Sequence, residues 1–436
     1  MPPGSDPAQP QSPRSTPLVF GPLGRFMLGR AAGITGAQLI SVAVGWELYE
    51  RTGDPWSLGL IGVFELAPVL LFMFAAGDVA DRFPRRTIAL WAHTFFTLNA
   101  LGLAYVSSAR LPIALTYGLL LGVGTARAFG SPAMAAFLPQ LLSRSELTRA
   151  NAWVASSFQL AMIGGPALAG ALIALTGGAT AAYGVAAACE LLFVLLLFTL
   201  PSIAPQVQKR SRSLAELLQG FHFIRRSGIF LAAISLDLLA VLLGGAVALL
   251  PIFAKDILQV GASGLGWLRA APALGALMMS LLVTRLPPWR RPGIVLLTSV
   301  AAFGLATLVF GLSTSFPLSM LALFLIGAFD AISVVIRMTL EQTLTPDSLR
   351  GRVSAINYVF IGCSNELGSF ESGATAALWG PVGAVVIGAC GTLAVVLAVG
   401  WIWPELLRLG PLHELDALDP PEFEGGEAQA SPRQSA

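Results

Sequence analysis

The sequence predicts an all-α integral membrane protein with about twelve transmembrane helices in two similar six-helix halves. The composition is 55% hydrophobic and only 11% charged, whereas soluble domains are about 25% charged. A chain this apolar would expose large hydrophobic patches in water, so its natural solvent is lipid. About twelve apolar stretches have the roughly 20 residues that a helix needs to cross a bilayer. The segment 138–142 also aligns with 340–344, an offset of 202 positions that brings the two halves into register.

The apolar stretches define the predicted spans in chain order. In the first half we place them near 25–49, 57–79, 87–107, 112–138, 150–176 and 181–200. In the second half we place them near 229–253, 262–285, 293–312, 317–340, 352–377 and 381–403. Turn-forming glycines separate several neighbours, among them Gly53, Gly177, Gly261 and Gly380.

These spans divide the chain into five predicted segments. The halves are 25–200 and 229–403, joined by a basic cytoplasmic linker over 201–228. Polar composition predicts that 1–24 and 404–436 are disordered cytoplasmic segments. The polar loops match under the offset as well as the helices do, since 146–149 aligns with 348–351 and Gly178 with Gly380. Two parallel repeats are a layout in which a substrate binds between them near the middle of the membrane.

The basic residues orient the predicted spans, because cytoplasmic loops carry an excess of Lys and Arg. One side receives Arg82, Arg85, Arg86, Arg144, Arg149, Lys209, Arg210, Arg212, Arg225, Arg226, Arg285, Arg290, Arg291, Arg337, Arg350, Arg352 and Arg408. The other side receives only Arg51, Arg110 and Lys255. This asymmetry predicts that both termini lie in the cytoplasm.

The loop between the second and third spans resembles the signature loop of the major facilitator superfamily. It reads Gly-Asp-Val-Ala-Asp-Arg-Phe-Pro-Arg-Arg over 77–86, with Pro84 where that family usually has a second glycine. The resemblance implies a conformational latch between helices, made by Gly77, Asp81, Arg82, Arg85 and Arg86. The alternative is that the arginines only anchor the loop at the lipid headgroups.

The fifth span holds Gly-Gly-Pro-Ala-Leu-Ala-Gly over 164–170, which is similar to the antiporter motif of that superfamily. Gly165, Pro166 and Gly170 would let helices approach closely and create a bend. The resemblance implies export, although a plain packing motif would look the same. Segments 266–272, 341–353 and 362–373 also resemble the branch that holds macrolide-efflux and enterobactin-exporter-like transporters.

Ionisable residues inside the spans are the candidate site, because charge at bilayer depth is costly and usually faces a cavity or a partner. The candidates are Arg127, Asp237, Asp330 and Glu366, with Gln38 as a polar neighbour. The resemblance implies that the first, fourth, seventh and tenth helices line a central cavity. A desolvated carboxylate favours its neutral form, so Asp330 or Asp237 would take up a proton. Arg127 would compete for that carboxylate or hold an anionic substrate group; the alternative is a static ion pair.

Three other ionisable residues receive weaker assignments. Glu371 lies about 140° round the helix from Glu366, so the two cannot face one place, and we favour Glu366 for the cavity. His93 is expected to be a hydrogen-bonded packing residue, with a proton relay as the alternative, and Glu190 has no assigned role.

The sequence lacks the patterns of other classes. Neither lysine, Lys209 or Lys255, follows a glycine-rich phosphate loop, and no metal-ligand spacing or nucleophile elbow is present. We therefore expect no enzyme, cofactor or metal, and no nucleic-acid partner. The expectation is a monomeric proton-coupled exporter of small amphiphilic molecules, such as drugs or siderophores, in a bacterial cytoplasmic membrane. Na⁺ coupling, an importer or lipid-handling facilitator, and a non-transporting sensor or scaffold stay open as alternatives.

Overall fold

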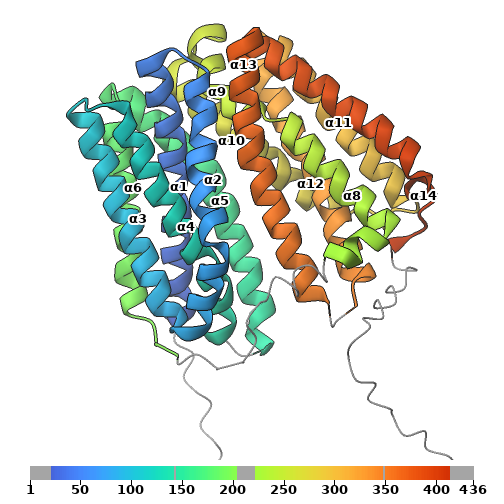
Figure 1. Cartoon of the computed structure of the whole chain (residues 1–436), viewed down its shortest axis with the longest axis horizontal. Helices are drawn as coiled ribbons and strands as arrows, with labels where there is room; N and C mark the ends of the chain where they lie inside the picture. Colours follow the sequence, from blue (N-terminus) through green and yellow to red (C-terminus); the bar gives the residue numbers. More distant parts are fainter. Residues whose placement is uncertain (1–20, 142–143, 204–220, 347–348, 413–436) are drawn as a thin grey trace, which may run out of the picture. The chain divides into compact units, whose positions relative to one another are not determined.

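The computed structural model describes residues 21–141, 144–203, 221–346 and 349–412, and every regular element among them is helical (Figure 1). Among these residues, eleven helical segments are long and apolar enough to cross a membrane. Large apolar side chains face outward, including Leu175 and Trp401, both 84% exposed. Exposed apolar surface of this kind suits a lipid environment. The predicted fold class is therefore confirmed.

The first six helices follow the predicted spans but extend further at several ends. They are α1 (Pro22–Thr52), α2 (Trp56–Arg82), α3 (Arg85–Ser108), α4 (Ile113–Leu141), α5 (Arg144–Thr176) and α6 (Thr180–Phe198). The second set comprises α8 (Gly228–Leu243), η1 (Ala246–Leu249), α9 (Leu250–Ile252), η2 (Phe253–Ile257), α10 (Gly261–Val283), α11 (Pro292–Leu312), α12 (Phe316–Leu344), α13 (Arg350–Ile402) and α14 (Pro404–Leu407).

The eleventh and twelfth predicted spans lie within the single element α13. Gly380 interrupts it with φ 77° and ψ 163°, backbone angles that only glycine adopts easily. The chain reverses direction there (Figure 1), so α13 supplies two crossings. This break accounts for the difference between eleven segments and the twelve expected spans.

The seventh predicted span is not one continuous helix. We expected a span over 229–253, but α8 ends at Leu243 and a 3₁₀ turn, a short α turn and a π-helical turn follow. A Cβ on Gly245 would lie 2.2 Å from Ser372 Oγ and 2.7 Å from the Gly368 carbonyl oxygen of α13. The glycines at the break therefore allow the chain to pass close to α13, where a continuous helix with side chains would collide.

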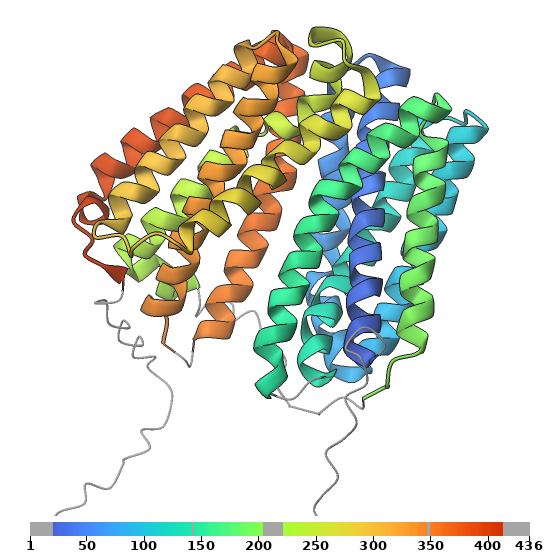
Figure 2. The same cartoon turned by 180° about the vertical axis from the view of Figure 1, so that it is seen from behind.

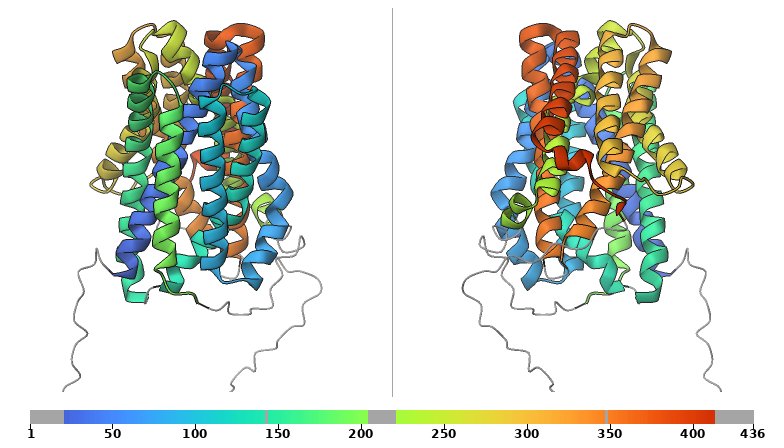
Figure 3. Two further views of the ribbon diagram at one scale, coloured as in Figure 1. Left: turned by 90° about the vertical axis from the view of Figure 1, so that its left-hand side faces the viewer. Right: turned by 90° about the vertical axis from the view of Figure 1, so that its right-hand side faces the viewer.

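The chain divides into two compact units. The first holds residues up to Val44 and from Ala67 to Lys209; the second holds Gly45–Leu66 and residues from Arg210 onward. In the first unit α3 packs against α4 and α6, and Figure 3 (left) shows α3 and α6 from outside. Its core is built by residues such as Phe26, Phe137 and Phe193.

In the second unit α12 packs against α10 and α11, and α13 packs against α8 and α11. Its core includes Phe230, Leu340 and Leu406, the last of which belongs to α14. The short α14 falls in the segment 404–436 that composition predicts to be disordered, and the fully buried side chain of Leu406 holds it. Of the other predicted non-membrane segments, residues 1–20, 204–220 and 413–436 lie outside the described residues.

Candidate functional site

A buried ion pair joins α8 and α12 in the second unit. Arg337 Nη1 lies 2.5 Å from Asp237 Oδ2, and each residue is only 9% exposed. Arg337 Nε also donates a hydrogen bond to Ser333 Oγ, at 3.2 Å, one turn earlier on α12. A charge removed from water is stable only when it is paired and hydrogen-bonded, and this guanidinium meets both conditions.

Asp330 brings a second carboxylate to the same helix face. Residues seven apart on an α-helix differ by only about 20° in direction, so Asp330 and Arg337 lie along one stripe of α12. The charges of both Asp237 and Arg337 act on Asp330. One guanidinium therefore stands within electrostatic reach of two carboxylates.

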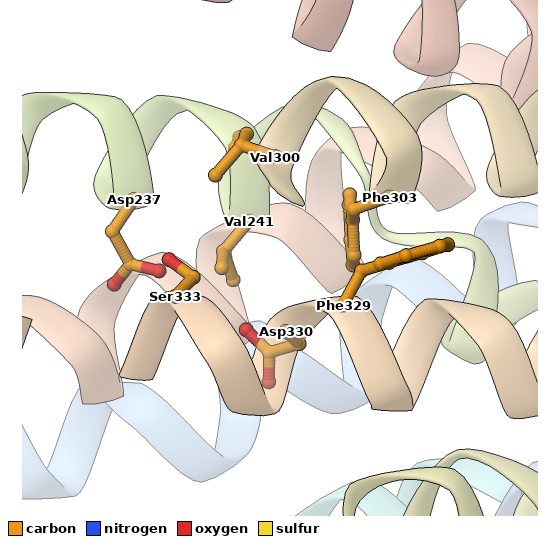
Figure 4. A pocket seen from close by; sticks show the side chains of 8 residues that line it. Asp237, Val241, Val300, Phe303, Phe329, Asp330 and Ser333 are labelled. Carbon is orange, nitrogen blue, oxygen red and sulfur yellow. The ribbon is translucent and has the colours of Figure 1, made fainter. Parts of the chain in front are cut away.

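A small cavity lies between the two aspartates (Figure 4). It is lined by Asp237, Ala240 and Val241 of α8, Val300 and Phe303 of α11, and Phe329, Asp330 and Ser333 of α12. Its volume is about 10 Å³, which is close to the room that one water molecule needs. In this view Ser333 lies between the two carboxylates. The cavity therefore has room for about one water molecule and for no organic substrate.

The break after α8 adjoins this cavity. A Cβ on Gly244 would lie 2.8 Å from Phe303, which lines the cavity, and Thr392 Oγ1 donates a hydrogen bond to the Ala240 carbonyl oxygen at 3.4 Å. Discontinuous helices in secondary transporters place backbone groups at the sites of substrates and coupling ions. The position of the break beside two carboxylates fits that arrangement.

A second group of charges lies in the same unit and contains Glu366. Arg269 of α10 is acted on by the charges of Glu65 of α2 and Glu366 of α13. Its Nη1 also donates a hydrogen bond of 3.5 Å to the carbonyl oxygen of Val247, which belongs to η1 just after the break. The helices approach closely here, since a Cβ on Gly62 would lie 2.4 Å from the Glu366 carbonyl oxygen. Glu366 therefore belongs to an arginine-centred group and not to the Asp237 cavity.

The remaining cavity candidates lie in the first unit. Arg127 is an exposed residue of α4, and Gln38 is a partly buried residue of α1. Gln38 packs against the proposed bend, since a Cβ on Gly165 would lie 2.6 Å from the Gln38 Cβ. Pro166 and Gly170 are buried within α5.

The predicted latch loop is a tight link between α2 and α3. Arg82 pairs with Asp78 at 3.1 Å, and Arg85 with Asp81 at 3.7 Å, both one turn apart. Arg86 makes a longer connection: it donates hydrogen bonds of 2.8 and 2.6 Å to the carbonyl oxygens of Leu197 and Phe198. Those two residues end α6, so the loop fastens the start of α3 to the end of α6. Gly77 has open space on its side-chain face.

Sequence reasoning missed Arg337, which it counted among the cytoplasmic anchors. Its spacing of seven residues from Asp330 was the available signal. It also missed Glu341, four residues further along α12, which accepts hydrogen bonds from Asn357 Nδ2 at 2.6 Å and from Ser354 Oγ at the start of α13. The polar face of α12 therefore continues from the cavity to the N-terminal end of α13.

Sequence reasoning also assigned no interaction partner to Lys255 or to the adjacent Asp256. Tyr49, at the end of α1, donates a hydrogen bond to Asp256 of η2, and Lys255 Nζ lies 5.6 Å from the centre of the Tyr49 ring. Within the described residues no group of three or more His, Cys, Asp or Glu side chains could hold a metal ion.

Membrane-length helices around buried, paired charges define a multi-pass membrane protein of the transporter class. The family follows from comparison. Residues 23–417 match the model of the family described as "Transmembrane secretion effector". The chain belongs to this family, which is a branch of the major facilitator superfamily, and the resemblance noted in the sequence is confirmed. Because this family consists of transporters, the chain is not an enzyme.

Curated relatives and solved structures agree with this assignment. The enterobactin exporter EntS of Shigella boydii serotype 18 is 29% identical over 382 residues, which cover 87% of this chain and 91% of the relative. The enterobactin exporter EntS of Escherichia coli O1:K1 matches with the same identity and coverage. These matches support a multi-pass bacterial membrane protein.

Two solved transporters share the fold. The nucleoside transporter NupG aligns with a TM-score of 0.68 at 17% identity, over 88% of this chain and 99% of that one. A bacterial homologue of the human lysosomal transporter Spinster, in an inward-facing and unoccupied conformation, aligns with a TM-score of 0.68 at 14% identity, over 90% and 97%. At these identities the likeness concerns the fold alone.

Proposed function

We propose that the chain is a proton-coupled exporter of small amphiphilic molecules, an antiporter that moves them out in exchange for protons. The family and the enterobactin-exporting relatives support export. The observation that carries proton coupling is the buried Asp237–Arg337 pair with Asp330 beside it, around a cavity large enough only for water.

Charge counting favours one proton at this site. Two ionised carboxylates and one guanidinium leave a net charge of −1 on Asp237, Asp330 and Arg337. An uncompensated charge in a low-dielectric site is costly. Binding of one proton to a carboxylate removes this net charge. The neutral form of the site therefore carries one proton, shared between the two aspartates that surround Arg337.

In the cycle that we propose, Arg337 exchanges one aspartate partner for another. Arg337 pairs with Asp237 while Asp330 holds the proton. When the proton leaves, Asp330 becomes a second charged acceptor and competes for Arg337. Because Asp237 lies on α8 and Asp330 on α12, that competition alters the tie between the two helices. An ion pair between α8 and α12 whose strength depends on protonation would link proton binding to alternating access.

We assign supporting roles to the other candidates. Arg127 and Gln38 would contact the substrate in the first unit, with Arg127 holding an anionic group. Gly165, Pro166 and Gly170 would form the bend of an exporter, and the latch loop with Asp81 and Arg85 would favour one access state. We further propose a monomer in the cytoplasmic membrane with both termini in the cytoplasm.

The substrate class is drug-like or siderophore-like. The name of the relatives, enterobactin exporter, supports a catecholate siderophore as the first compound to test. An arginine on the first unit fits the anionic character of such a compound.

The experiment is transport by purified protein in proteoliposomes with an imposed pH gradient. The panel contains dyes, macrolides and catecholate siderophores, and the gradient is collapsed with a protonophore as the control. We expect movement of at least one compound that depends on the gradient and stops when it collapses. Movement that follows an imposed sodium gradient and ignores the pH gradient would replace the proton by Na⁺. Movement that needs neither gradient would contradict antiport.

A further inference from the structure

Glu190 is a buried carboxylate that the proposed cycle does not use. It lies on α6 of the first unit and is only 1% exposed. Its Oε2 atom lies 2.8 Å from Nδ1 of His93 on α3. A fully buried acid with a titratable partner is a candidate for holding a proton, because leaving it charged and unpaired is costly.

His93 is held so that it reaches both the acid and the outside. Its ring contacts Phe193, one turn from Glu190 on α6, with 4.3 Å between ring centres. The side chain of His93 is 18% exposed and that of Glu190 only 1%, so His93 is the member of the pair that can be reached from the surface. An imidazole in this position can accept a proton at Nε2 and pass one from Nδ1, because its two nitrogens lie on different edges.

Glu190 also faces glycine residues of α1, the helix that runs between α5 and α6 (Figure 2). A Cβ on Gly33 would lie 3.6 Å from Glu190 Oε1, and one on Gly36 would lie 3.4 Å from Glu190 Cγ. Gly29 continues the stripe, where a Cβ would lie 2.4 Å from the Phe193 ring. The absence of side chains on this face of α1 makes the space that Glu190 and Phe193 occupy.

Another face of α1 contacts the proposed bend in α5. Gln38 lies five residues beyond Gly33, and it packs against Gly165 of α5. A shift of α1 away from Glu190 would therefore also alter the contact with Gly165. The buried pair and the bend are linked through one helix.

Few other charges face the pair. On α6, Cys189 is adjacent and feels the charge of Glu190. On α3, Arg86 is bound to the carbonyl oxygens at the end of α6, about two turns away. On α1, Arg30 lies about 100° round the helix from Gly29 and about 60° from Gly33, and residues 150–176 of α5 hold no titratable side chain. His93 is the basic group in direct contact with Glu190.

We propose that His93 and Glu190 form a second proton-binding site, in the first unit, whose occupancy is coupled to the packing of α1. With one proton the pair has no net charge, as a neutral acid and imidazole or as an ion pair. Without it, the site carries one buried negative charge against the α1 backbone. That state is relieved when α1 moves and water reaches Glu190. The proposal extends the proton coupling proposed above, but its test requires no transport.

The test uses purified protein in lipid nanodiscs over about pH 5 to about pH 10, a range that covers histidine and a buried acid. The chain has three histidines, so replacing His222 and His413 by Gln leaves His93 as the only source of ¹⁵N-histidine ring signals. Infrared difference spectra report the protonated carboxyl of Glu190, identified by its loss in Glu190→Gln. Glutamine keeps an oxygen that can accept from Nδ1, so this variant removes the proton and spares the hydrogen bond. Thr97→Val, one turn from His93 on α3, is the matched control.

A spin label on Ala37→Cys, with the three natural cysteines replaced, reports the motion of α1. We expect the His93 signals, the carboxyl band and the label to change over one common pH interval, and the label to lose its pH response in Glu190→Gln. Ring signals and a carboxyl band that stay constant over the whole range would make the pair a packing hydrogen bond and overturn the site. A change in both without any change at the label would overturn the coupling to α1.

Discussion

Asp237 and Asp330 compete for one guanidinium, and the geometry ranks them. Asp237 holds Arg337 at 2.5 Å, and Ser333 fixes the other side of the arginine by accepting from Nε. Asp330 lies seven residues from Arg337 on the same helix and is influenced by the charges of both members of the pair. In the proposed cycle the two aspartates therefore have unlike roles: Asp237 would be the standing counter-ion of Arg337, and Asp330 would be the carboxylate that gains and loses the proton.

At the residue scale this ranking predicts unequal effects on stability. Asp237→Asn leaves Arg337 buried without its counter-ion, and the loss of one partner of a buried pair costs about 3 to 5 kcal/mol. The double change Asp237→Asn with Arg337→Gln removes both charges and should recover much of that loss. Thermal unfolding in detergent, followed by intrinsic tryptophan fluorescence, measures both variants. A double variant that is no more stable than Asp237→Asn would show that the pair is not a mutual counter-ion.

The residues of this site were only partly predictable from sequence. Asp237 and Asp330 stand out because a carboxylate within an apolar run is rare and costly. Arg337 was assigned to the cytoplasmic surface because it lies toward the end of a span that carries further charges. Which way a side chain near a helix end faces depends on how the helix is rotated against its neighbours. The rotation of a helix cannot be deduced from one sequence. The seven-residue spacing does indicate that Arg337 and Asp330 share one face of the helix.

Among the elements, the interrupted seventh span shows what hydropathy leaves out. Residues 229–253 are uniformly apolar, so a window of hydrophobicity predicts one helix. The Gly244-Gly245 pair was the local sign of a break, but glycine is frequent in membrane helices and does not by itself end one. The break is fixed by tertiary packing, in which Gly245 meets Gly368 and Ser372 of α13.

At the element scale the bend motif offers two neighbouring glycines with unlike surroundings. A Cβ on Gly165 would lie 2.6 Å from the Gln38 Cβ and 3.4 Å from the Thr35 carbonyl oxygen, whereas one on Gly164 would meet nothing within 4 Å. Gly165→Ala must therefore push α1 and α5 apart, with an expected stability loss of about 1 to 3 kcal/mol. Gly164→Ala should be neutral, and it is the matched control.

Thermal unfolding and transport rates of the two alanine variants measure this difference. We expect Gly165→Ala to lower both the unfolding temperature and the transport rate, because α1 also contacts Glu190. Equal behaviour of Gly164→Ala and Gly165→Ala would mean that the α1–α5 contact does not matter for either property.

For the molecule as a whole, the physics of the bilayer made the architecture predictable. Apolar length sets the spans, because a helix must cover the hydrocarbon thickness of the bilayer. The distribution of arginines predicts their orientation, which stays a prediction. The glycine at each predicted break was also informative: Gly53, Gly177, Gly261 and Gly380 all have positive φ. Pairings such as Asp237–Arg337 and His93–Glu190 were not predictable, since each joins helices that lie far apart in sequence.

The same scale brings out a likeness between the two units. Each contains a buried acid in direct contact with a basic residue of a second helix, Glu190 with His93 and Asp237 with Arg337. In the second unit the extra carboxylate of Asp330 makes the site neutral when one proton binds. In the first unit the proposed proton would be held by the His93–Glu190 pair itself. On this account a transport cycle can involve a proton in either unit, and variants of each site separate their contributions.

The measurement that tests the central claim most directly is gradient-driven transport by Asp330→Asn in proteoliposomes, beside the wild type, over a series of pH values. The control is Asp54→Asn, an exposed residue that accepts a hydrogen bond from the Trp56 backbone N–H at the start of α2, a role that asparagine fills equally well. We expect Asp330→Asn to fold and to bind substrate but to lose both the response to the pH gradient and the pH dependence of transport. Unchanged transport with unchanged pH dependence in Asp330→Asn would contradict the account and remove Asp330 from proton coupling.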